Sequence, residues 1–271
     1  MPIDGASGIR SMSSTAPTYT HDNFLLACQL HGRVSIYWRY EIFDSTGADH
    51  LKSAVEPKKV QIHSHRFSNP GISQFRVSSN PHRSPLSVVT AIRRGLHDEV
   101  QQRISRPLLP EFHIRSVGKI ARRVWEGYVA TELDHDNRAS DDDRRDLRPF
   151  QICRTQVDLS IPQHFDKATF SYNLHLVMEF DVSDAGISEA TARHMRDAIL
   201  EVSRDHDYQL SRGAILPDHI DLIVGCPLDE TPTDVALQYL NRLSDHSGRQ
   251  QIFRFSASVS TFGEDDLDGM E

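Results

Sequence analysis

A histidine and an aspartate two residues apart are the first groups in this 271-residue chain whose types and spacing could support chemistry. His219 and Asp221 stand in the stretch 216–224, where apolar residues alternate with them. Because successive side chains of a β-strand point to opposite faces, the pair projects from one face. One imidazole and one carboxylate can bind one divalent cation. The same pattern also fits a hydrogen-bonded pair or two solvated positions on a strand with one buried face.

The segment after this strand predicts a helix with a well-defined start. A short loop containing Pro227 leads to Thr231, which suits an N-cap, followed by Pro232 at the first helical position and Asp234 at the third. The order of strand, loop and capped helix resembles the HUH single-tyrosine transposases of the insertion-sequence-200 type and their REP-associated relatives. In that family the strand motif reads histidine, hydrophobic residue, histidine, so Asp221 replaces the second histidine.

The same order of elements occurs earlier in the chain, which predicts an internal repeat. A shift of 147 residues superposes Pro70 on Pro217, Val77 on Val224, Ser84-Pro85 on Thr231-Pro232, Val88 on Val235 and Leu96 on Leu243. Period-two strands at 34–42 and 172–182 open the two copies. We therefore expect an α+β fold of two units, residues 21–134 and 151–263. The resemblance implies ferredoxin-like units, with antiparallel sheets and helices on one face, arranged as an intramolecular pseudo-dimer.

The two copies have kept different parts of the resembled site. Ile72 and Gln74 stand in the first copy where His219 and Asp221 stand in the second. Only the first copy continues from its last strand into a helix, at 119–134. The apolar residues of this helix keep helical spacing, which predicts that they form its inner face, and they are Ile120, Ala121, Val124, Trp125 and Tyr128. In the family this helix carries the nucleophilic tyrosine and, four residues later, a glutamine ligand, and here the helix offers Tyr128 and Glu132.

The resemblance implies one composite site made from the two copies. Tyr128 would be the nucleophile that forms a 5′-phosphotyrosine with single-stranded or hairpin DNA, and Glu132, His219 and Asp221 would hold a cation. Two carboxylates and one imidazole suit Mg²⁺ or Mn²⁺. Taken separately, Tyr128 also fits a core aromatic and Glu132 a solvated glutamate.

Charge is unevenly distributed along the chain. The net charge is −8, but residues 56–127 carry +8 and the remainder −16. The basic segment predicts a surface for DNA phosphates or, equally, a solvated basic face. The candidate DNA-binding residues are Arg76, Arg93, Arg94, Arg122 and Arg123. The triplet His63-Ser64-His65 is interpreted as exposed strand.

Composition places the chain among globular proteins, with 38% apolar and 25% charged residues. No apolar run is long enough to span a membrane, and no signal peptide is evident, so we expect a cytoplasmic protein without membrane partners. Residues 1–20 read as a flexible leader, 135–150 as a charged linker and 264–271 as an acidic tail. Cys28, Cys153 and Cys226 are expected to be buried.

Three functions remain open at this point. The first is a metal-dependent DNA nicking and joining enzyme, monomeric because the pseudo-dimer already supplies the family's subunit interface. The second is a hairpin-binding protein with weak or no catalysis. The third is an α+β module in which the His-Asp pair is incidental.

Overall fold

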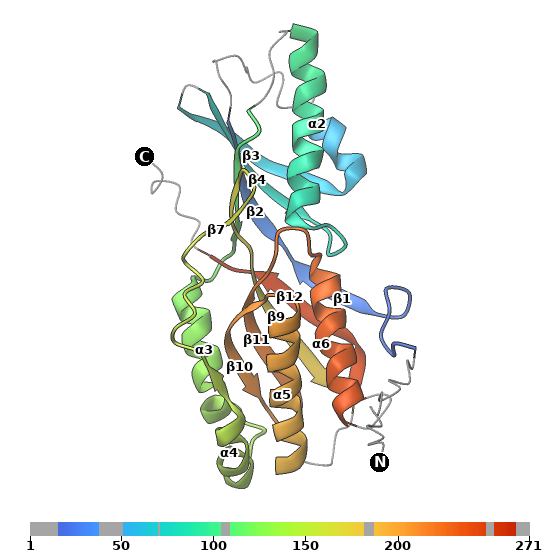
Figure 1. The fold of residues 1–271 in the computed structure, drawn as a ribbon, viewed down its shortest axis with the longest axis vertical. Coiled ribbons are helices and arrows are strands. Elements are labelled where there is room, and N and C mark those ends of the chain that lie inside the picture. The colour runs from blue at the N-terminus through green and yellow to red at the C-terminus, as the bar shows by residue number, and fades with distance from the viewer. Residues whose placement is uncertain are drawn as a thin grey trace, which may run out of the picture.

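The computed structural model describes residues 16–37, 51–69, 71–103, 109–181, 187–247 and 252–263. It is an α+β protein with two six-stranded sheets placed one above the other along the long axis (Figure 1). Sheet A has the order β1 (Leu25–Gln29), β12 (Phe253–Thr261), β9 (Asn173–Phe180), β11 (His219–Gly225), β10 (Gln209–Ile215) and β6 (Ile152–Cys153). Sheet B has the order β3 (Val60–Asn69), β4 (Ile72–Ser79), β2 (His31–Tyr37), β5 (Phe112–Val117), β8 (Ala168–Ser171) and β7 (Gln163–Phe165).

One strand order occurs in both sheets. The four antiparallel strands β3-β4-β2-β5 of sheet B correspond in chain order to β10-β11-β9-β12 of sheet A. Strands β4 and β11 begin at Ile72 and His219, and the helices that follow them are α2 (Pro85–Arg103) and α6 (Pro232–Ser247). Both pairs of elements are offset by the same interval, so the repeat spacing found in the sequence is the spacing of the structural elements.

The two sheets exchange strands. The chain passes from β1 in sheet A directly into β2 in sheet B, and later from β8 in sheet B directly into β9 in sheet A. β1 lies parallel to β12 and β8 lies parallel to β5, so the first half of the chain adds β1 to sheet A and the second half adds β8, with β7 at its outer side, to sheet B. The sequence predicted neither pairing.

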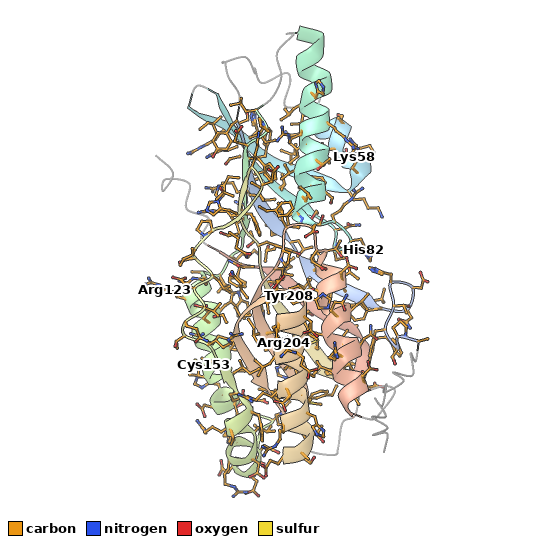
Figure 2. The ribbon with its side chains drawn as sticks, in the orientation of Figure 1. Lys58, His82, Arg123, Cys153, Arg204 and Tyr208 are labelled. Atoms are coloured by element: carbon orange, nitrogen blue, oxygen red, sulfur yellow. The ribbon has the colours of Figure 1, made fainter. Side chains whose placement is uncertain are left out.

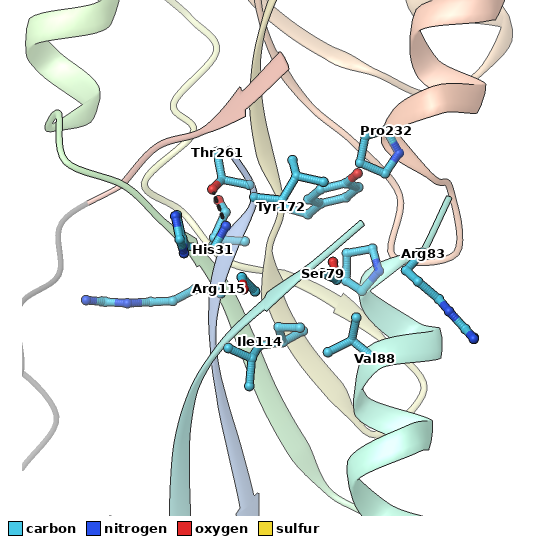
Figure 3. A pocket seen from close by; sticks show the side chains of 16 residues that line it. His31, Ser79, Arg83, Val88, Ile114, Arg115, Tyr172, Pro232 and Thr261 are labelled. Atoms are coloured by element: carbon cyan, nitrogen blue, oxygen red, sulfur yellow. Dashed lines mark hydrogen bonds between the residues drawn. The ribbon is translucent and has the colours of Figure 1, made fainter. Parts of the chain in front are cut away.

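Reciprocal hydrogen bonds join the halves where the chain crosses. His31 N donates to Thr261 Oγ1 (2.8 Å) and Asn173 N to Ser116 Oγ (3.0 Å), while Leu86 N donates to Leu228 O (3.0 Å) and Thr233 N to Pro81 O (3.1 Å). In the second pair of bonds, each donor and each acceptor is related to its counterpart by the repeat spacing. Figure 3 shows the small pocket at the crossing, with the His31–Thr261 bond between residues from the two ends of the chain.

Sheet A is covered on both faces. Helices α5 (Glu189–Asp205) and α6 lie on one face, and α3 (Arg122–His135) crosses from the first half of the chain to pack on the other, against β10 and β11 (Figure 1). Every residue of β11 is consequently buried. The alternative in which His219 and Asp221 are solvated positions on a strand with one buried face is therefore wrong, because α3 covers the face that carries them.

Sheet B is covered by helix on one face. Val34, Ile36 and Phe75 of this sheet belong to the same core as Val88 and Ile92 of α2. Within the described ranges, no second helix lies on the opposite face.

Helix α3 does not bury the residues that its apolar spacing predicted. Val124 is 61% exposed and Tyr128 47% exposed. The buried positions are Glu126, Val129, Glu132 and Leu133. This helix therefore places two carboxylates against the sheet, each of which needs a partner there.

The described end of the predicted leader and the predicted linker both contain packed residues. Tyr19, inside the predicted leader, is 1% exposed; its hydroxyl donates to Phe253 O and accepts from Phe253 N, both at 2.9 Å. The predicted linker contains α4 (Asp141–Leu147), which begins with a capping box between Ser140 and Asp143. Leu147 is the buried residue of this helix, so its charged sequence has no apolar periodicity from which a helix could be predicted.

Other local predictions have mixed outcomes. Thr231 caps α6 through Asp234 N (3.0 Å), and α5 begins after Ser188 with its apolar side buried, as predicted. Cys28 and Cys153 are exposed, so only Cys226 is the buried cysteine expected. The second half of the predicted strand 34–42 lies outside the described residues. Among the described helices, none has the length and apolar character needed to cross a membrane.

Candidate metal centre

Glu132, His219 and Asp221 meet between α3 and sheet A. His219 Nε2 lies 3.5 Å from Glu132 Oε1 and 3.8 Å from Asp221 Oδ1, and one ligand atom from each residue lies within 4.8 Å of the other two. All three side chains are buried. The structure thus brings together a glutamate from the first half of the chain and a histidine and aspartate from the second.

A second set of contacts fixes the orientation of His219. Asp218 Oδ1 lies 2.7 Å from Nδ1, and because a carboxylate can only accept, Nδ1 carries the hydrogen. Nε2 therefore faces Glu132 and Asp221. Arg138, from the segment predicted as a linker, forms an ion pair with Asp218. A carboxylate on the far nitrogen of a ligating histidine is the usual arrangement around protein-bound metals.

The electrostatics of the group favour a positive charge. Burial lowers the pKa of His219, but its contacts with Glu132 and Asp218 and the charge of Asp221 outweigh burial and raise it to about 9. Burial also raises the pKa of Glu132; the contact with His219 opposes this and the charge of Asp221 adds to it. In the metal-free protein, a proton on His219 balances the two carboxylates.

Asp221 is held by a histidine that the sequence analysis did not select. His175 Nε2, on the neighbouring strand β9, donates to Asp221 Oδ2 (3.0 Å). The ring of Trp125, from α3, lies against the His175 ring with centroids 4.0 Å apart. The hydrogen bond from His175 fixes Asp221 Oδ2 and leaves Oδ1 directed toward His219.

The donor set fits a hard divalent cation. Glu132 Oε2 and Asp221 Oδ1 are buried and have no hydrogen-bond partner in the described part of the chain. Buried carboxylate oxygens without partners are costly, and a cation with oxygen preference would satisfy both. The other buried glutamate of α3, Glu126, accepts instead from Ser211 Oγ (2.6 Å) and Arg122 (2.8 Å), so only the Glu132 side of the helix is left for a ligand.

Tyr128 lies one helical turn before Glu132 on α3, so both side chains share a face. Its ring contacts Trp125 edge to face, with centroids 5.9 Å apart, and nearly half of its surface is exposed. Burial, followed by the charges of Glu132 and Asp221, raises the pKa of the Tyr128 phenol. The hydroxyl is thus accessible to a substrate and is under the electrostatic influence of the group.

An open groove runs beside the centre over sheet A. It has a volume of about 360 Å³ and is bounded by Trp125 and His175 on the side of the metal group. Its floor is formed by β1, β9 and β12, with Ala27, Cys28, Gln29, Val177, Ser258, Val259 and Ser260. Trp125, which lines this groove, is also the residue whose ring contacts Tyr128.

The predicted DNA-binding arginines fall into two groups. Arg93 donates to the carbonyls of Leu109 (2.8 Å) and Pro110 (2.7 Å), and Arg122 pairs with Glu126, so both guanidinium groups have partners inside the fold. Arg76, Arg94 and Arg123 are exposed. Arg123 lies at the start of α3 (Figure 2).

Four residues of the centre were missed by the sequence analysis. Asp218 precedes His219, so their adjacency was readable; His175 alternates with the buried residues of its strand and could have been placed on the same face as Asp221. Trp125 was counted only among the apolar residues of its helix. No local signal identifies Arg138, because its contact with Asp218 joins two distant parts of the chain and depends on the tertiary fold.

No family model and no curated protein sequence matches this chain. Among solved structures, a REP-associated tyrosine transposase bound to a REP hairpin matches with a TM-score of 0.31 and 15% identity, over 34% of this chain and 57% of that one. A glycine cleavage system transcriptional repressor matches at TM-score 0.23 and 10% identity over 87% and 98% of the two chains, and a microcompartment protein from Desulfitobacterium hafniense DCB at 0.21 and 9% over 88% and 97%. At these scores, function has to be argued from the site itself.

Proposed function

We propose that the protein is a metal-dependent, transposase-like enzyme that nicks and joins DNA through Tyr128. The observation that carries the proposal is the meeting of Glu132 with His219 and Asp221 across two halves of one chain, with the exposed Tyr128 one helical turn before Glu132. A nucleophile beside a cation site is the minimum that phosphoryl transfer to a tyrosine requires.

Each residue has a distinct role in the proposed reaction. The Tyr128 oxygen attacks the scissile phosphorus, its proton leaves to solvent, and the bond from phosphorus to the 3′-oxygen breaks; the 3′-oxygen then takes up a proton. The products are a 5′-phosphotyrosine and a 3′-hydroxyl, as the resemblance implies. Glu132, His219 and Asp221 would hold Mg²⁺ or Mn²⁺, which when bound supplies positive charge for the transition state. The groove beside Trp125 would hold the unpaired strand.

The pseudo-dimer is part of this proposal. The strand order shared by the two halves, the exchanged strands and the reciprocal hydrogen bonds support this proposal, because an isologous interface between two ferredoxin-like subunits would be reciprocal in the same way. Because this interface is internal, we expect a monomer in solution. Light scattering that gave a dimer mass at low micromolar concentration would contradict it.

The test of catalysis is a covalent-adduct assay. Protein, Mn²⁺ and a hairpin DNA with single-stranded flanks labelled at the 3′ end are mixed and separated on a denaturing gel. Wild type should retain the label, because the protein becomes joined to the 5′-phosphate of the downstream fragment. Tyr128→Phe should give none, whereas the control Tyr37→Phe should behave as wild type. Equal adduct in wild type and Tyr128→Phe, or no adduct on any hairpin, would overturn the proposal.

A second function is favoured by a separate observation. The described strands of sheet B carry exposed arginines and no metal group, so the protein could recognise hairpin DNA without cutting it. DNA binding with no adduct under all metal conditions would identify this alternative.

A further inference from the structure

The groove over sheet A lies on the same face of the sheet as the metal centre. Helix α3 packs on β10 and β11 at one side of this face, and the groove opens over β9, β12 and β1 at the other. His175 lines the groove and donates to Asp221 Oδ2, while Trp125 lines the groove and contacts Tyr128. A molecule in the groove would therefore touch one residue that supports a metal ligand and another that contacts the proposed nucleophile.

The strand register shows which side chains form the floor of the groove. Gln29 on β1 is directly opposite Ser260 on β12, which is directly opposite His175 on β9. The second row lies two residues along each strand and consists of Ala27, Ser258 and Val177. Val177 is in turn directly opposite Asp221 on β11. The floor is thus two rows of one sheet face that run from the exposed edge strand to the metal centre, and its alanine and two serines leave room above them.

The lining of the groove is uncharged where a nucleic-acid phosphate would need a cation. Among the described residues that form it, none is an aspartate, glutamate, lysine or arginine. An anion or a cation would lose its hydration there without gaining an opposite charge. The groove therefore suits an uncharged molecule, and its volume of about 360 Å³ is within the range of small-ligand sites.

The floor and the wall of the groove offer two kinds of contact. The side chains of Gln29, Ser258 and Ser260 are exposed or half-buried and form no hydrogen bond within the described part of the chain. An amide carries donors and an acceptor together, a hydroxyl can act as either, and the edges of a nucleobase carry the same groups. The wall is the half-buried indole ring of Trp125, on which a planar ring can stack.

An uncharged planar ring with polar edges fits the floor, the wall and the absence of charge together. We propose that the groove binds one unpaired nucleobase, which stacks on Trp125 and directs its polar edge to Gln29, Ser258 and Ser260. The choice of a nucleobase rests on the proposed function, because the base would belong to the strand whose phosphate Tyr128 attacks. The contact is with a base and is separate from any contact between arginines and phosphates.

The fluorescence of Trp125 reports a base stacked on it. The sequence has two tryptophans, so Trp38→Phe leaves Trp125 as the single emitter. Two probes are titrated in EDTA, namely a short oligothymidylate and an abasic oligomer of the same length, which has the same phosphates and no bases. The oligothymidylate should quench the Trp125 emission, and the abasic oligomer should leave it nearly unchanged. In separate titrations with labelled probes, followed by anisotropy, the abasic oligomer should bind about tenfold or more weakly.

The variants are uncharged, so they separate base contacts from phosphate contacts. Ser258→Phe fills the groove from its floor and should weaken oligothymidylate binding about tenfold. The slope of log affinity against log salt should not change, because no phosphate contact is lost. The control Ser256→Phe adds the same ring to an exposed position of β12 outside the groove and should bind as wild type. Trp125→Leu removes the stacking ring and should match Ser258→Phe, whereas Trp125→Phe should keep part of the affinity.

Three outcomes would overturn the proposal. One is the same change in Trp125 emission, or no change, with the two probes. Another is equal loss of affinity in Ser258→Phe and Ser256→Phe, which would indicate a general effect of an added ring on β12. The third is wild-type affinity in both Ser258→Phe and Trp125→Leu. Normal adduct formation together with any of these would refute the base contact alone, whereas base-dependent quenching with no adduct under any metal condition would refute only the proposed catalysis.

Discussion

Sheet A and sheet B have the same strand order but present opposite chemistry. On sheet A, α3 covers β10 and β11 and brings Glu132 to His219 and Asp221. On sheet B the matching positions are Ile72 and Gln74, and the neighbouring strands carry arginines. The fold alone therefore does not determine a metal site; the third ligand has to come from a helix that only one half of the chain supplies.

The difference between the sheets also shows how two halves with the same strand order can supply different residues of one site. A symmetric pair of sites would need His, Asp, Tyr and Glu in both copies. Here the first half supplies Tyr128 and Glu132 and the second half supplies His219 and Asp221, so the proposed function has one composite site where the halves meet. The corresponding face of sheet B can then carry groups that would repel a cation.

The largest expected effect comes from removing a ligand of sheet A. With Mn²⁺ at one hundred times its dissociation constant, binding should stabilise the wild-type fold by about 2.7 kcal/mol. Each kcal/mol should raise the melting temperature by about 2–4 °C. Asp221→Asn should lose this response. Glu126→Gln alters the other buried carboxylate of α3, which has partners within the fold, and should keep it. If Asp221→Asn were stabilised by Mn²⁺ as much as wild type, Asp221 would not be a metal ligand.

The crossing between the sheets offers a second comparison. A Cβ on Gly263, whose φ is +140°, would lie 2.6 Å from Ser116 O, and one on Gly118 would lie even closer to Thr261 O. Gly118→Ala and Gly263→Ala should each destabilise the protein by about 1–3 kcal/mol. A Cβ at Gly127 on α3 would meet no atom within 4 Å, and Gly127→Ala should stabilise the protein by about 0.5–1 kcal/mol. Urea denaturation of the three variants measures this, and unchanged stability in either crossing variant would remove the case for a tight interlock.

Local sequence signals could predict much of this fold and part of the site. Period-two strands, the Thr231 capping box and the repeat spacing each depend on short patterns that can be read directly along the chain, and each agrees with the structure. The exchanged strands β1 and β8 could not be predicted, because their partners lie in the other half of the chain and the pairing depends on both halves being folded.

Burial of charge was the hardest feature to predict. Apolar spacing assigned Tyr128 and Val124 to the inner face of α3, since a glutamate is rarely buried without a partner. The partners of Glu126 and Glu132 are Ser211 and His219, both supplied by sheet A. A helix whose buried face is chosen by distant polar partners gives no periodic signal.

A smaller effect should follow from loosening Asp221. His175→Phe keeps a ring against Trp125 but removes the donor to Asp221 Oδ2. Loss of such a supporting contact costs about 10–100-fold in metal affinity, and calorimetric titration with Mn²⁺ measures it. His175→Gln retains a donor and should lose less. Equal Mn²⁺ affinity in wild type and His175→Phe would show that Asp221 does not need the hydrogen bond from His175 to bind the metal.

The smallest expected effect is the change that Asp218→Asn makes to the pH dependence of metal binding at sheet A. The pKa of His219 in the folded protein is about 9, above the ordinary 6.5, so His219 holds a proton at neutral pH when no metal is bound. The stability contributed by this proton is fully present below about pH 6.5 and is lost as pH rises through about 9. A cation must displace the proton, so Mn²⁺ affinity should rise with pH by up to about tenfold per unit between pH 6 and 8. Mn²⁺ titrations at pH 6, 7 and 8 measure the slope. Asp218→Asn removes a carboxylate that helps raise this pKa and should make the slope shallower near pH 8; the same slope in both proteins would mean that proton displacement from His219 does not control binding.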